Sequence, residues 1–275
     1  MRADLHTHTL FSDGILSPEQ LLIKAADRGL SAIAITDHDT IEGAVEAQKY
    51  AVKYNLDVII GCEFSCFDNE KEYHILGLNL NPHCENLLNH LKNYRNARLY
   101  RAKQIHKKLD MLGIKFDFDE IVQLAGEAPI TRPHIAQVLV NHNVVSSLRE
   151  AFNNYIGDGC PAYQPKAVFP VKSCINLINR AGGVAVIAHP RNYIEPTTLY
   201  NFIEQGLDGI EVYHPSHTDE FVRYYHYVAS QYWLLETGGS DFHGNRDWDE
   251  NNFGKYTVDI SVVESIKYQS ATKAL

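Results

Sequence analysis

The sequence predicts an α/β fold built mainly on parallel strands, with a helical insertion. Short β-branched apolar runs alternate with helical stretches over the first 80 residues or so, and again from about residue 170. Several of these runs lead directly into a His, Asp or Glu, as at the C-terminal ends of strands in parallel barrels. Between the two parts the strand rhythm stops. We therefore expect one large α/β domain from residues 1–115 and 169–275, and a mainly helical cap from 116–168.

The first strand carries Asp4-Leu5-His6-Thr7-His8. Because residues i and i+2 of a strand share a face, His6 and His8 should point the same way, with Leu5 packed on the other side. The next segment, Ser17-Pro18-Glu19-Gln20, has the pattern of a capping box with proline at the first helical position, so a helix should begin at Pro18.

The following runs continue the alternation. Residues 32–35 and 58–61 read as buried strands separated by a helical stretch over about 41–54, and Glu63 comes just past the second run. A shorter strand over about 73–80 carries His74 near its start. Later strands at 184–188, 209–213 and 233–237 lead to His189, to His214 and His217, and to Asp241 and His243, which gives roughly seven strand-helix units.

A long helix is expected over about residues 84–112, and it holds a basic strip without acids between Asn86 and Leu109. The strip fits either a solvated helix face or a surface that steers a polyanionic substrate. Its members are Lys92, Arg95, Arg98, Arg101, Lys103, Lys107 and Lys108.

Composition narrows the function classes. The 275 residues carry a net charge of −9, are 45% hydrophobic and 21% charged, and contain no apolar run long enough for a membrane span. The start of the chain lacks a basic-then-apolar leader, and the five cysteines form no C-x-x-C pair, so we expect reduced thiols and a cytoplasmic location. We see no sign of an obligate protein partner. Fourteen histidines are many for this length, and several should be metal ligands.

Nine residues of the ligand type lie near the ends of strand-like runs. Such a set exceeds what one ion needs, which indicates two to three divalent ions, and mixed imidazole and carboxylate ligation favours Zn²⁺, Mn²⁺ or Fe²⁺. The nine are His6, His8, Asp13, His38, Glu63, His74, His189, Asp241 and His243.

These motifs resemble the PHP (polymerase and histidinol phosphatase) superfamily of metal-dependent phosphoesterases. The resemblance rests on Asp4–Thr9 with Ser12-Asp13-Gly14, Thr36–Asp39, Gly61–Glu63, Ala188–Pro190 and Gly239–Gly244. The segments 72–77, 131–136 and 211–217 are similar to a branch of nucleotide phosphatases and 5′-to-3′ exonucleases that act on short RNA or 3′,5′-bisphosphorylated nucleotides. The resemblance implies a distorted (β/α)7 TIM-like barrel, the PHP fold, with a helical insertion.

The resemblance also implies how the ligands are shared. One ion would be held by His6, His8, Glu63 and Asp241, a second by Glu63, His74 and His189, and a third by Asp13, His38 and His243. Other members have His where Asp13 stands, which exchanges one ligand type for another. We expect Asp37, next to His38, to orient a ligand imidazole.

The expected reaction is attack on phosphorus by a metal-activated hydroxide. Arg132 and His134 of the cap would bind the phosphate, with His134 also a candidate acid for the leaving oxygen, while His214, His217 and Lys166 would contact substrate. A surface salt bridge is the competing interpretation of Arg132. The substrate would be a small phosphorylated nucleotide or a short oligonucleotide.

Two alternatives remain open. A histidinol-phosphate phosphatase would share the metal motifs, and the segment from Arg132 to Ala136 favours the nucleotide branch only by resemblance. A non-catalytic, metal-stabilised scaffold or binding module would be expected to have lost several ligands, and all nine are intact.

Overall fold

The computed structural model describes residues 1–191 and 193–273. Contacts divide the chain into two compact units: the barrel unit, Met1–Asn89 with Phe169–Leu275, and the second unit, His90–Val168. Helix α4 (Glu85–Met111) begins in the barrel unit and continues into the second unit. The second unit therefore includes most of a helix that the sequence pattern left with the barrel.

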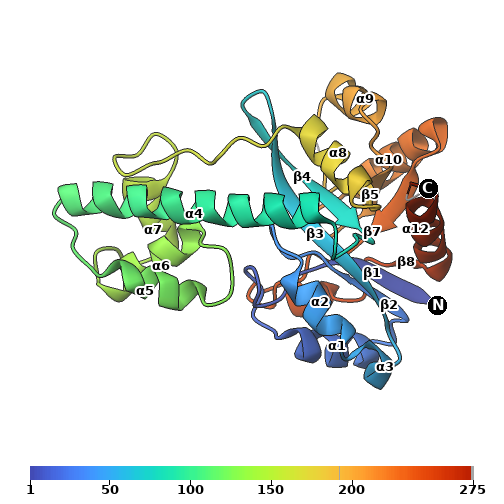
Figure 1. Ribbon diagram of the computed structural model, residues 1–275, viewed down its shortest axis with the longest axis horizontal. Coiled ribbons are helices and arrows are strands. Elements are labelled where there is room, and N and C mark those ends of the chain that lie inside the picture. The colour runs from blue at the N-terminus through green and yellow to red at the C-terminus, as the bar shows by residue number, and fades with distance from the viewer. Residues whose placement is uncertain (192, 274–275) are drawn as a thin grey trace. The chain divides into compact units, whose positions relative to one another are not determined.

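The described part of the barrel unit contains an eight-stranded sheet in the order β7-β6-β5-β4-β3-β2-β1-β8 (Figure 1). Neighbouring strands are parallel from β1 to β3 and from β5 to β7, whereas β4 is antiparallel to both its neighbours and the short β8 is antiparallel to β1. The strands are β1 (Arg2–Thr7), β2 (Ala32–Ile35), β3 (Asp57–Asp68), β4 (Lys71–Leu78), β5 (Val184–Ile187), β6 (Gly209–Tyr213), β7 (Leu235–Gly238) and β8 (Val258–Asp259).

The sheet curls until the segment after β7 meets β1. The Asp241 amide donates to the His6 carbonyl over 2.9 Å, and the His8 amide donates to the Phe242 carbonyl over 2.9 Å. Strands β1 to β7 thus form a nearly closed barrel, which confirms the predicted distorted (β/α)7 architecture. Closure also places residues from opposite ends of the sequence side by side.

Helices cover the outside and one end of this barrel. The capping box at Ser17 is confirmed, because its hydroxyl accepts from the Gln20 amide while the Gln20 side chain accepts from the Ser17 amide. The predicted helix over 41–54 is two shorter helices, α2 and α3. The barrel helices are α1 (Pro18–Asp27), α2 (Glu42–Gln48), α3 (Ala51–Tyr54), α8 (Val171–Arg180), α9 (Pro196–Glu204), α10 (Asp219–Tyr232), α11 (Asp249–Asn252) and α12 (Ile260–Lys273).

The register between β1 and β2 shifts within β1. Ala3 pairs with Ala32, but Thr7 pairs with Ile35, so β1 has one residue more than β2 over this interval. Leu5 packs in the same core cluster as Ala3 and Ala32. The expectation that Leu5 is packed into the core is confirmed, because its side chain is fully buried.

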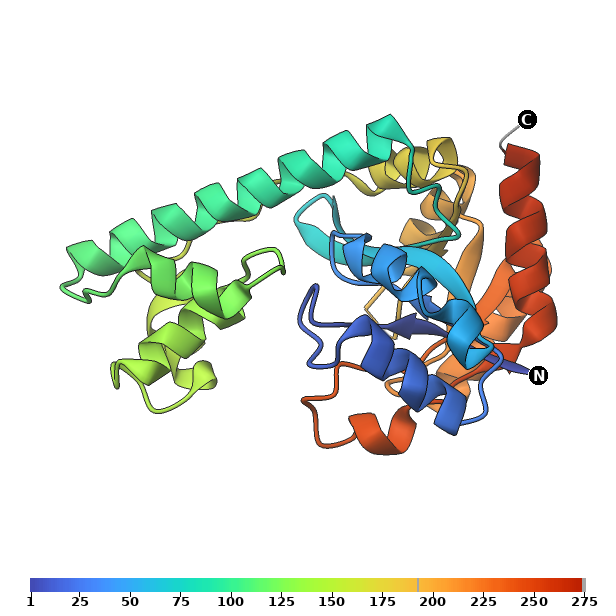
Figure 2. The ribbon, with the colours of Figure 1, turned by 60° about the horizontal axis from the view of Figure 1, so that its bottom comes forward.

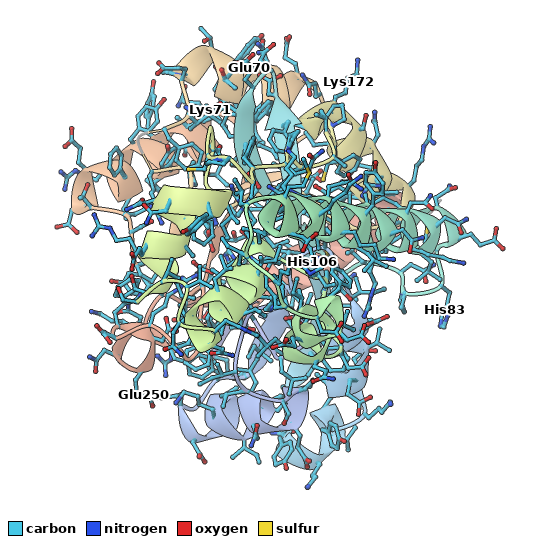
Figure 3. The ribbon with its side chains drawn as sticks, turned by 90° about the vertical axis from the view of Figure 1, so that its left-hand side faces the viewer. Glu70, Lys71, His83, His106, Lys172 and Glu250 are labelled. Carbon is cyan, nitrogen blue, oxygen red and sulfur yellow. The ribbon has the colours of Figure 1, made fainter. Side chains whose placement is uncertain are left out.

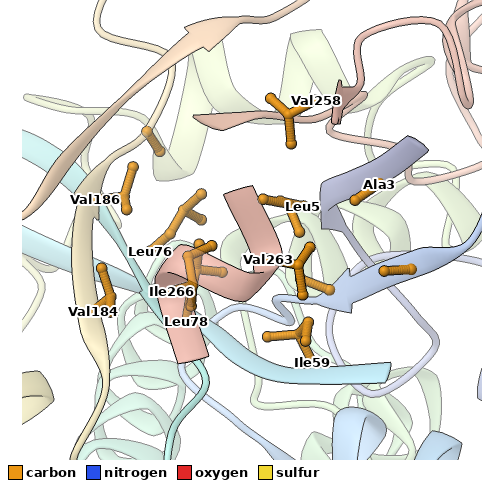
Figure 4. Close-up of a cluster of buried hydrophobic side chains, with 13 residues drawn as sticks. Ala3, Leu5, Ile59, Leu76, Leu78, Val184, Val186, Val258, Val263 and Ile266 are labelled. Atoms are coloured by element: carbon orange, nitrogen blue, oxygen red, sulfur yellow. The ribbon is translucent and has the colours of Figure 1, made fainter. Parts of the chain in front are cut away.

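The barrel core closes against α12. Val263 and Ile266 of this helix are buried among inward-facing residues such as Leu5, Leu76 and Val186 (Figure 4). In the two ribbon views α12 and the start of β1 lie on the same side of the barrel unit (Figures 1 and 2). Apolar side chains therefore fill this end of the barrel, and polar groups gather at the other.

The second unit is helical and has a core of its own. Besides α4 it contains α5 (Phe118–Ala125), α6 (Arg132–Asn141), α7 (Leu148–Ala151) and a π-helix, η1 (Phe152–Ile156). Ile105 and Leu109 of α4 pack with Ile135 and Leu139 of α6. His106, labelled in Figure 3, donates from Nε2 to the Phe116 carbonyl over 2.8 Å and so ties α4 to the segment before α5. Across residues 1–191 and 193–273, we find no helix with the length and apolarity that crossing a membrane would require.

Candidate metal centre

Glu63 stands at the centre of a cluster of imidazoles inside the barrel unit. Its Oε2 lies 3.2 Å from Nε2 of both His6 and His8 and 3.3 Å from Nδ1 of His38. Its Oε1 lies 2.7 Å from Nδ1 of His74 and 2.9 Å from Nε2 of His189. One carboxylate, only 1% exposed, thus faces five imidazoles of the described chain through both of its oxygens.

Two further carboxylates extend the cluster. Asp241 Oδ1 lies 3.2 Å from His8 Nε2 and 3.5 Å from His6 Nε2. Asp13 Oδ1 lies 3.1 Å from His243 Nε2, and its Oδ2 lies 3.9 Å from His38 Nε2. The structure therefore brings all nine predicted ligands into one continuous group, contributed by segments from β1 to the loop after β7.

Within this group, sets of donor atoms lie close enough to share an ion. One set is His6, His8, Glu63 and Asp241, the same four that the sequence predicted for the first ion. A second set contains the predicted Asp13, His38 and His243 together with His8. A third set contains Glu63, His74 and His38. His189 was expected in this set in place of His38, and its Nε2 lies beside Glu63 Oε1.

The donor atoms fit a cation because several of them lack any other partner. His8 Nε2, Asp13 Oδ1 and His38 Nδ1 are buried, and no group in residues 1–191 or 193–273 meets them with hydrogen-bond geometry. A buried polar atom without a partner costs about 1–3 kcal/mol, which a bound cation would relieve. Imidazole nitrogens and carboxylate oxygens are also the donors that divalent transition metals prefer.

Hydrogen bonds on the far side of two rings fix which nitrogen faces the cluster. His6 Nδ1 bonds to Glu211 Oε1 over 2.9 Å, and His243 Nδ1 donates to the Asp241 carbonyl over 2.8 Å. When Nδ1 carries the proton, Nε2 has the free electron pair that a metal ion needs. Glu211 had no role in the sequence prediction, although an acid between Ile210 and Val212 of a buried strand was a signal for one.

The electrostatics of the cluster suit cations. Burial would raise the pKa of Glu63, but the neighbouring rings of His38, His74 and His6 outweigh it and hold this pKa well below its usual range. Burial lowers the pKa of His8, yet the carboxylates around it raise the pKa to about 9. In His74 the Glu63 carboxylate likewise overcomes burial and raises the pKa to about 10. Without metal, protons therefore occupy positions that a cation would take.

His38 differs from these two rings. Burial lowers its pKa to about 4, because the attraction of Glu63 and Asp13 does not offset the loss of solvation and the neighbouring His8 and His74. His38 is therefore neutral near pH 7, the form in which imidazole binds metal.

Asp37 was expected to orient a ligand imidazole, and its carboxylate bonds to the turn that follows His8. Its carboxylate accepts from the Thr9 amide over 2.7 Å, from the Thr9 hydroxyl over 2.6 Å and from the Ser12 hydroxyl over 2.6 Å. Ser12 Oγ in turn lies 3.5 Å from His8 Nδ1. Asp37 thus organises the turn after β1 and acts on His8 through Ser12.

The positions of two ligands along their strands also differ from expectation. Glu63 was expected just past the end of a strand, but β3 continues to Asp68 and Glu63 lies at its middle. His74 lies in the middle of β4, opposite Ser65 of β3. Because β3 and β4 form a long antiparallel pair, the central residues of this pair lie level with the C-terminal ends of the shorter strands.

His214 and His217 lie in the loop after β6 and have different roles. His214 Nε2 is 3.6 Å from Asp241 Oδ2, while its Nδ1 accepts from the Ser216 hydroxyl over 2.7 Å. His217 donates from Nδ1 to the Val212 carbonyl over 2.8 Å and accepts at Nε2 from the Arg191 amide over 3.1 Å. His214 thus faces the cluster of predicted ligands, whereas both ring nitrogens of His217 form hydrogen bonds with the backbone.

The other predicted substrate contacts, Arg132, His134 and Lys166, belong to the second unit. Arg132 pairs with Asp158 over 2.6 Å and donates to the Ile156 carbonyl over 3.3 Å. His134 Nδ1 accepts from the Thr131 amide over 3.2 Å in the capping box of α6. Lys166 lies in the segment that returns to the barrel. The salt bridge considered for Arg132 is therefore present.

Side chains of the basic strip on α4 form hydrogen bonds within the second unit. Arg98 and Arg101 are each only 8% exposed, and Arg101 donates to the Gln164 carbonyl over 2.7 Å. Lys108 donates to the Gln164 side chain over 3.0 Å. A solvated helix face was the wrong interpretation for Arg98 and Arg101, and the bonds of Arg101 and Lys108 hold the returning segment against α4.

A buried cluster of imidazoles and carboxylates inside an α/β barrel is typical of hydrolases that use divalent cations, and the fold and the site together indicate this class of protein. A family model described as "PHP domain" matches residues 4–157, more than half of the chain, so the chain belongs to the PHP domain family. It is similar to a 3′,5′-nucleoside bisphosphate phosphatase from Chromobacterium violaceum, with 34% identity over 89% of each chain. It is also similar to a 5′-3′ exoribonuclease from Haemophilus influenzae, with 33% identity over 96% of each chain.

A solved structure described as a metal-dependent phosphoesterase from Bifidobacterium adolescentis superimposes with a TM-score of 0.85. It is 31% identical, over 97% of this chain and 96% of that one. The protein is therefore a hydrolase of phosphoester bonds with a site for divalent metal. The relatives give no support to the histidinol-phosphate phosphatase alternative.

Proposed function

We propose that the protein hydrolyses phosphate esters of nucleotides, 3′,5′-bisphosphonucleotides or short oligonucleotides, with two to three divalent ions of Mn²⁺, Fe²⁺ or Zn²⁺. The observation that carries the proposal is the position of Glu63, whose two oxygens face separate sets of imidazoles. A carboxylate in that position can bridge ions, and clusters of bridged ions suit the displacement of one oxygen by another at phosphorus.

Each ligand has a proposed place. His6, His8, Glu63 and Asp241 would hold one ion, and Asp13, His38 and His243, with His8 near them, a second. A third would lie between Glu63 and His74 with either His38 or His189. When bound, such ions lower the pKa of a water molecule and neutralise charge on the phosphoryl oxygens.

The protein's own groups would orient this chemistry. Glu211 holds the ring of His6 so that Nε2 faces the cluster, and its other oxygen accepts from the His189 amide over 2.7 Å. Arg132 and His134 would contribute phosphate contacts, with His134 also a candidate acid for the leaving oxygen, and Lys166 a further contact. His214 would contact substrate beside Asp241, since its Nε2 faces that carboxylate.

The nucleotide part of the proposal is supported by the relatives, named as a nucleoside bisphosphate phosphatase and an exoribonuclease. The test is a screen of purified protein with Mn²⁺ against a nucleoside 3′,5′-bisphosphate, short RNA, short DNA, a simple aryl phosphate and histidinol phosphate. We expect the highest kcat/KM on the bisphosphate or on RNA.

Metal analysis of the same preparation should give two to three ions per chain. One ion or none would contradict the cluster. If histidinol phosphate were the best substrate, the nucleotide assignment would be wrong although the metal centre remained. A metal-loaded protein without activity on any of these esters would favour a scaffold or binding module.

A further inference from the structure

A second structural feature adjoins the metal centre within the barrel unit. A cavity of about 350 Å³ opens beside Asp241 and His214 and is lined also by Arg191, Arg246 and Trp248. Its size is within the range of small-molecule sites. Neither arginine nor the tryptophan was assigned a role by the sequence motifs.

Arg191 is held in a fixed position at one wall of this cavity. Its backbone has a φ of 45°, a conformation that non-glycine residues rarely adopt, and its amide donates to His217 Nε2 over 3.1 Å. Its carbonyl accepts from the Tyr225 hydroxyl. Its Nε donates to Ser216 Oγ over 2.8 Å. These contacts use the backbone and Nε, and no carboxylate in the described chain pairs with the two terminal nitrogens.

Two hydrogen bonds connect Arg191 through Ser216 to His214, a ring that faces the metal centre. Ser216 Oγ accepts from Arg191 and can donate its own proton to His214 Nδ1, 2.7 Å away. His214 Nε2 then carries the proton and faces Asp241 Oδ2 at 3.6 Å. A strained backbone that persists because several bonds hold it is a common feature of functional sites.

Arg246 lies between the cavity and the metal centre. Its Nη1 donates to Asp241 Oδ2 over 2.9 Å, and its Nη2 is 3.2 Å from His243 Nε2. If His243 Nε2 binds a cation, Arg246 Nη2 loses that acceptor and can donate to a ligand in the cavity. Arg246 would thus add a second positive group facing the same space as Arg191.

Trp248 supplies a flat apolar surface at the cavity. Its side chain is 55% exposed although it lines the cavity, so it is only partly covered by protein. Two guanidinium groups and one indole ring match a ligand that has a phosphate and an aromatic base, because arginine binds phosphate through paired donors and bases stack on aromatic rings.

We propose that this cavity binds the part of the substrate that remains after hydrolysis, a nucleoside monophosphate whose phosphate lies on Arg191 and Arg246 and whose base stacks on Trp248. This proposal rests on the proposed hydrolysis of nucleotides at the neighbouring metal centre. It makes the barrel unit itself the source of selectivity for a doubly phosphorylated nucleotide over a simple phosphate monoester.

The kinetic test compares two substrates of the metal-loaded protein, a nucleoside 3′,5′-bisphosphate and a simple aryl phosphate. Arg191→Met should lower kcat/KM for the bisphosphate about 10- to 100-fold, mainly through KM, and by clearly more than it lowers kcat/KM for the aryl phosphate. Arg191→Lys should recover part of the loss. Arg223→Met, an exposed arginine on α10, should change neither. An equal loss on both substrates, or no loss on the bisphosphate, would overturn the proposal.

A binding measurement separates this proposal from the proposed function. The chain has two tryptophans, and Trp233 is 92% exposed, so in a Trp233→Phe background the fluorescence reports on Trp248 alone. Adenosine 5′-monophosphate added to the metal-loaded protein should change this fluorescence saturably, with adenosine or the Arg191→Met variant binding about tenfold or more weakly.

If the wild-type protein fails to prefer bisphosphonucleotides, the substrate assignment is wrong, and the fluorescence result then decides on the cavity by itself. A saturable change that depends on Arg191 supports it. No change with the monophosphate, or a change that adenosine reproduces with equal affinity, rules it out.

Discussion

Glu63 is the residue on which the metal centre depends most. Because both of its oxygens face imidazoles, Glu63→Gln would remove a negative charge from more than one ion site at once. We expect metal content to fall by at least one ion per chain and kcat/KM to fall by about 1000-fold or more, since the cluster supplies several kcal/mol of charge stabilisation.

Elemental analysis with parallel kinetics on the same preparation measures both effects. Glu72→Gln is a matched control, because Glu72 is a neighbouring acid that lies 3.6 Å from the outer nitrogen of His74. A Glu63→Gln protein with wild-type metal content would show that Glu63 bridges no ions.

Metal binding should also release protons from individual imidazole rings. Neighbouring carboxylates raise the pKa of His6 well above its usual value, that of His8 to about 9 and that of His74 to about 10, so these three rings are protonated at pH 7 without metal. A metal ion needs the neutral ring, and binding should therefore release about three protons per chain at pH 7. It follows that metal affinity falls as pH is lowered below these pKa values.

Calorimetric titration of Mn²⁺ in two buffers of different ionisation enthalpy measures this release. We expect the observed enthalpy to change between the buffers and the affinity to rise from pH 6 to pH 8. An enthalpy that is the same in both buffers would mean that the rings were already neutral. His38, with a pKa of about 4, should contribute nothing to the release.

At the scale of elements, the closure of the barrel requires a glycine. A Cβ on Gly239 would lie 2.2 Å from the Cβ of His6 and 2.5 Å from its amide nitrogen. The segment after β7 can pass β1 this closely only without a side chain. Gly239→Ala should therefore destabilise the protein by about 1–3 kcal/mol or more and displace His6.

Thermal unfolding and metal content together check this prediction. Gly29→Ala is the control, because Gly29 has a φ of 68° but open space around it, so this variant should lose only about 1 kcal/mol through backbone strain and keep its metal. If Gly239→Ala behaved in the same way as Gly29→Ala, the close approach to His6 would not limit closure.

The elements were largely predictable because their signals are local. The cap at Ser17, the apolar run of β2 and the long α4 each follow from residues within a few positions of one another. The register shift within β1 was not predictable, since it is visible only in the pairing with β2. The length of β3 was missed for a related reason, because its second half is stabilised by pairing with β4.

The proposed ligands follow from their residue types and motifs, whereas the groups that orient them do not. Glu211 acts on His6, 205 positions away in sequence, and Arg246 acts on Asp241 across a loop. Neither contact has a spacing that sequence alone would reveal. Asp37 is a similar case, because its place beside His38 does not reveal the bonds to Thr9 and Ser12 through which it acts on His8.

At the scale of the whole molecule, the described chain separates two tasks. All nine proposed metal ligands lie in the barrel unit, while Arg132, His134 and Lys166 lie in the second unit. Metal binding should therefore not depend on Arg132. This separation gives a way to tell a substrate contact from a structural ion pair.

Arg132→Ala should leave metal content unchanged and lower kcat/KM for a phosphorylated nucleotide about 10- to 100-fold if the arginine binds phosphate. Asp158→Ala removes the partner of the ion pair and keeps the arginine, so it separates the two roles. If Arg132 only stabilises the second unit, both variants should lower the melting temperature alike and neither should change kcat/KM. If Arg132 binds substrate, Asp158→Ala should keep or raise kcat/KM, because it frees the guanidinium that Arg132→Ala deletes.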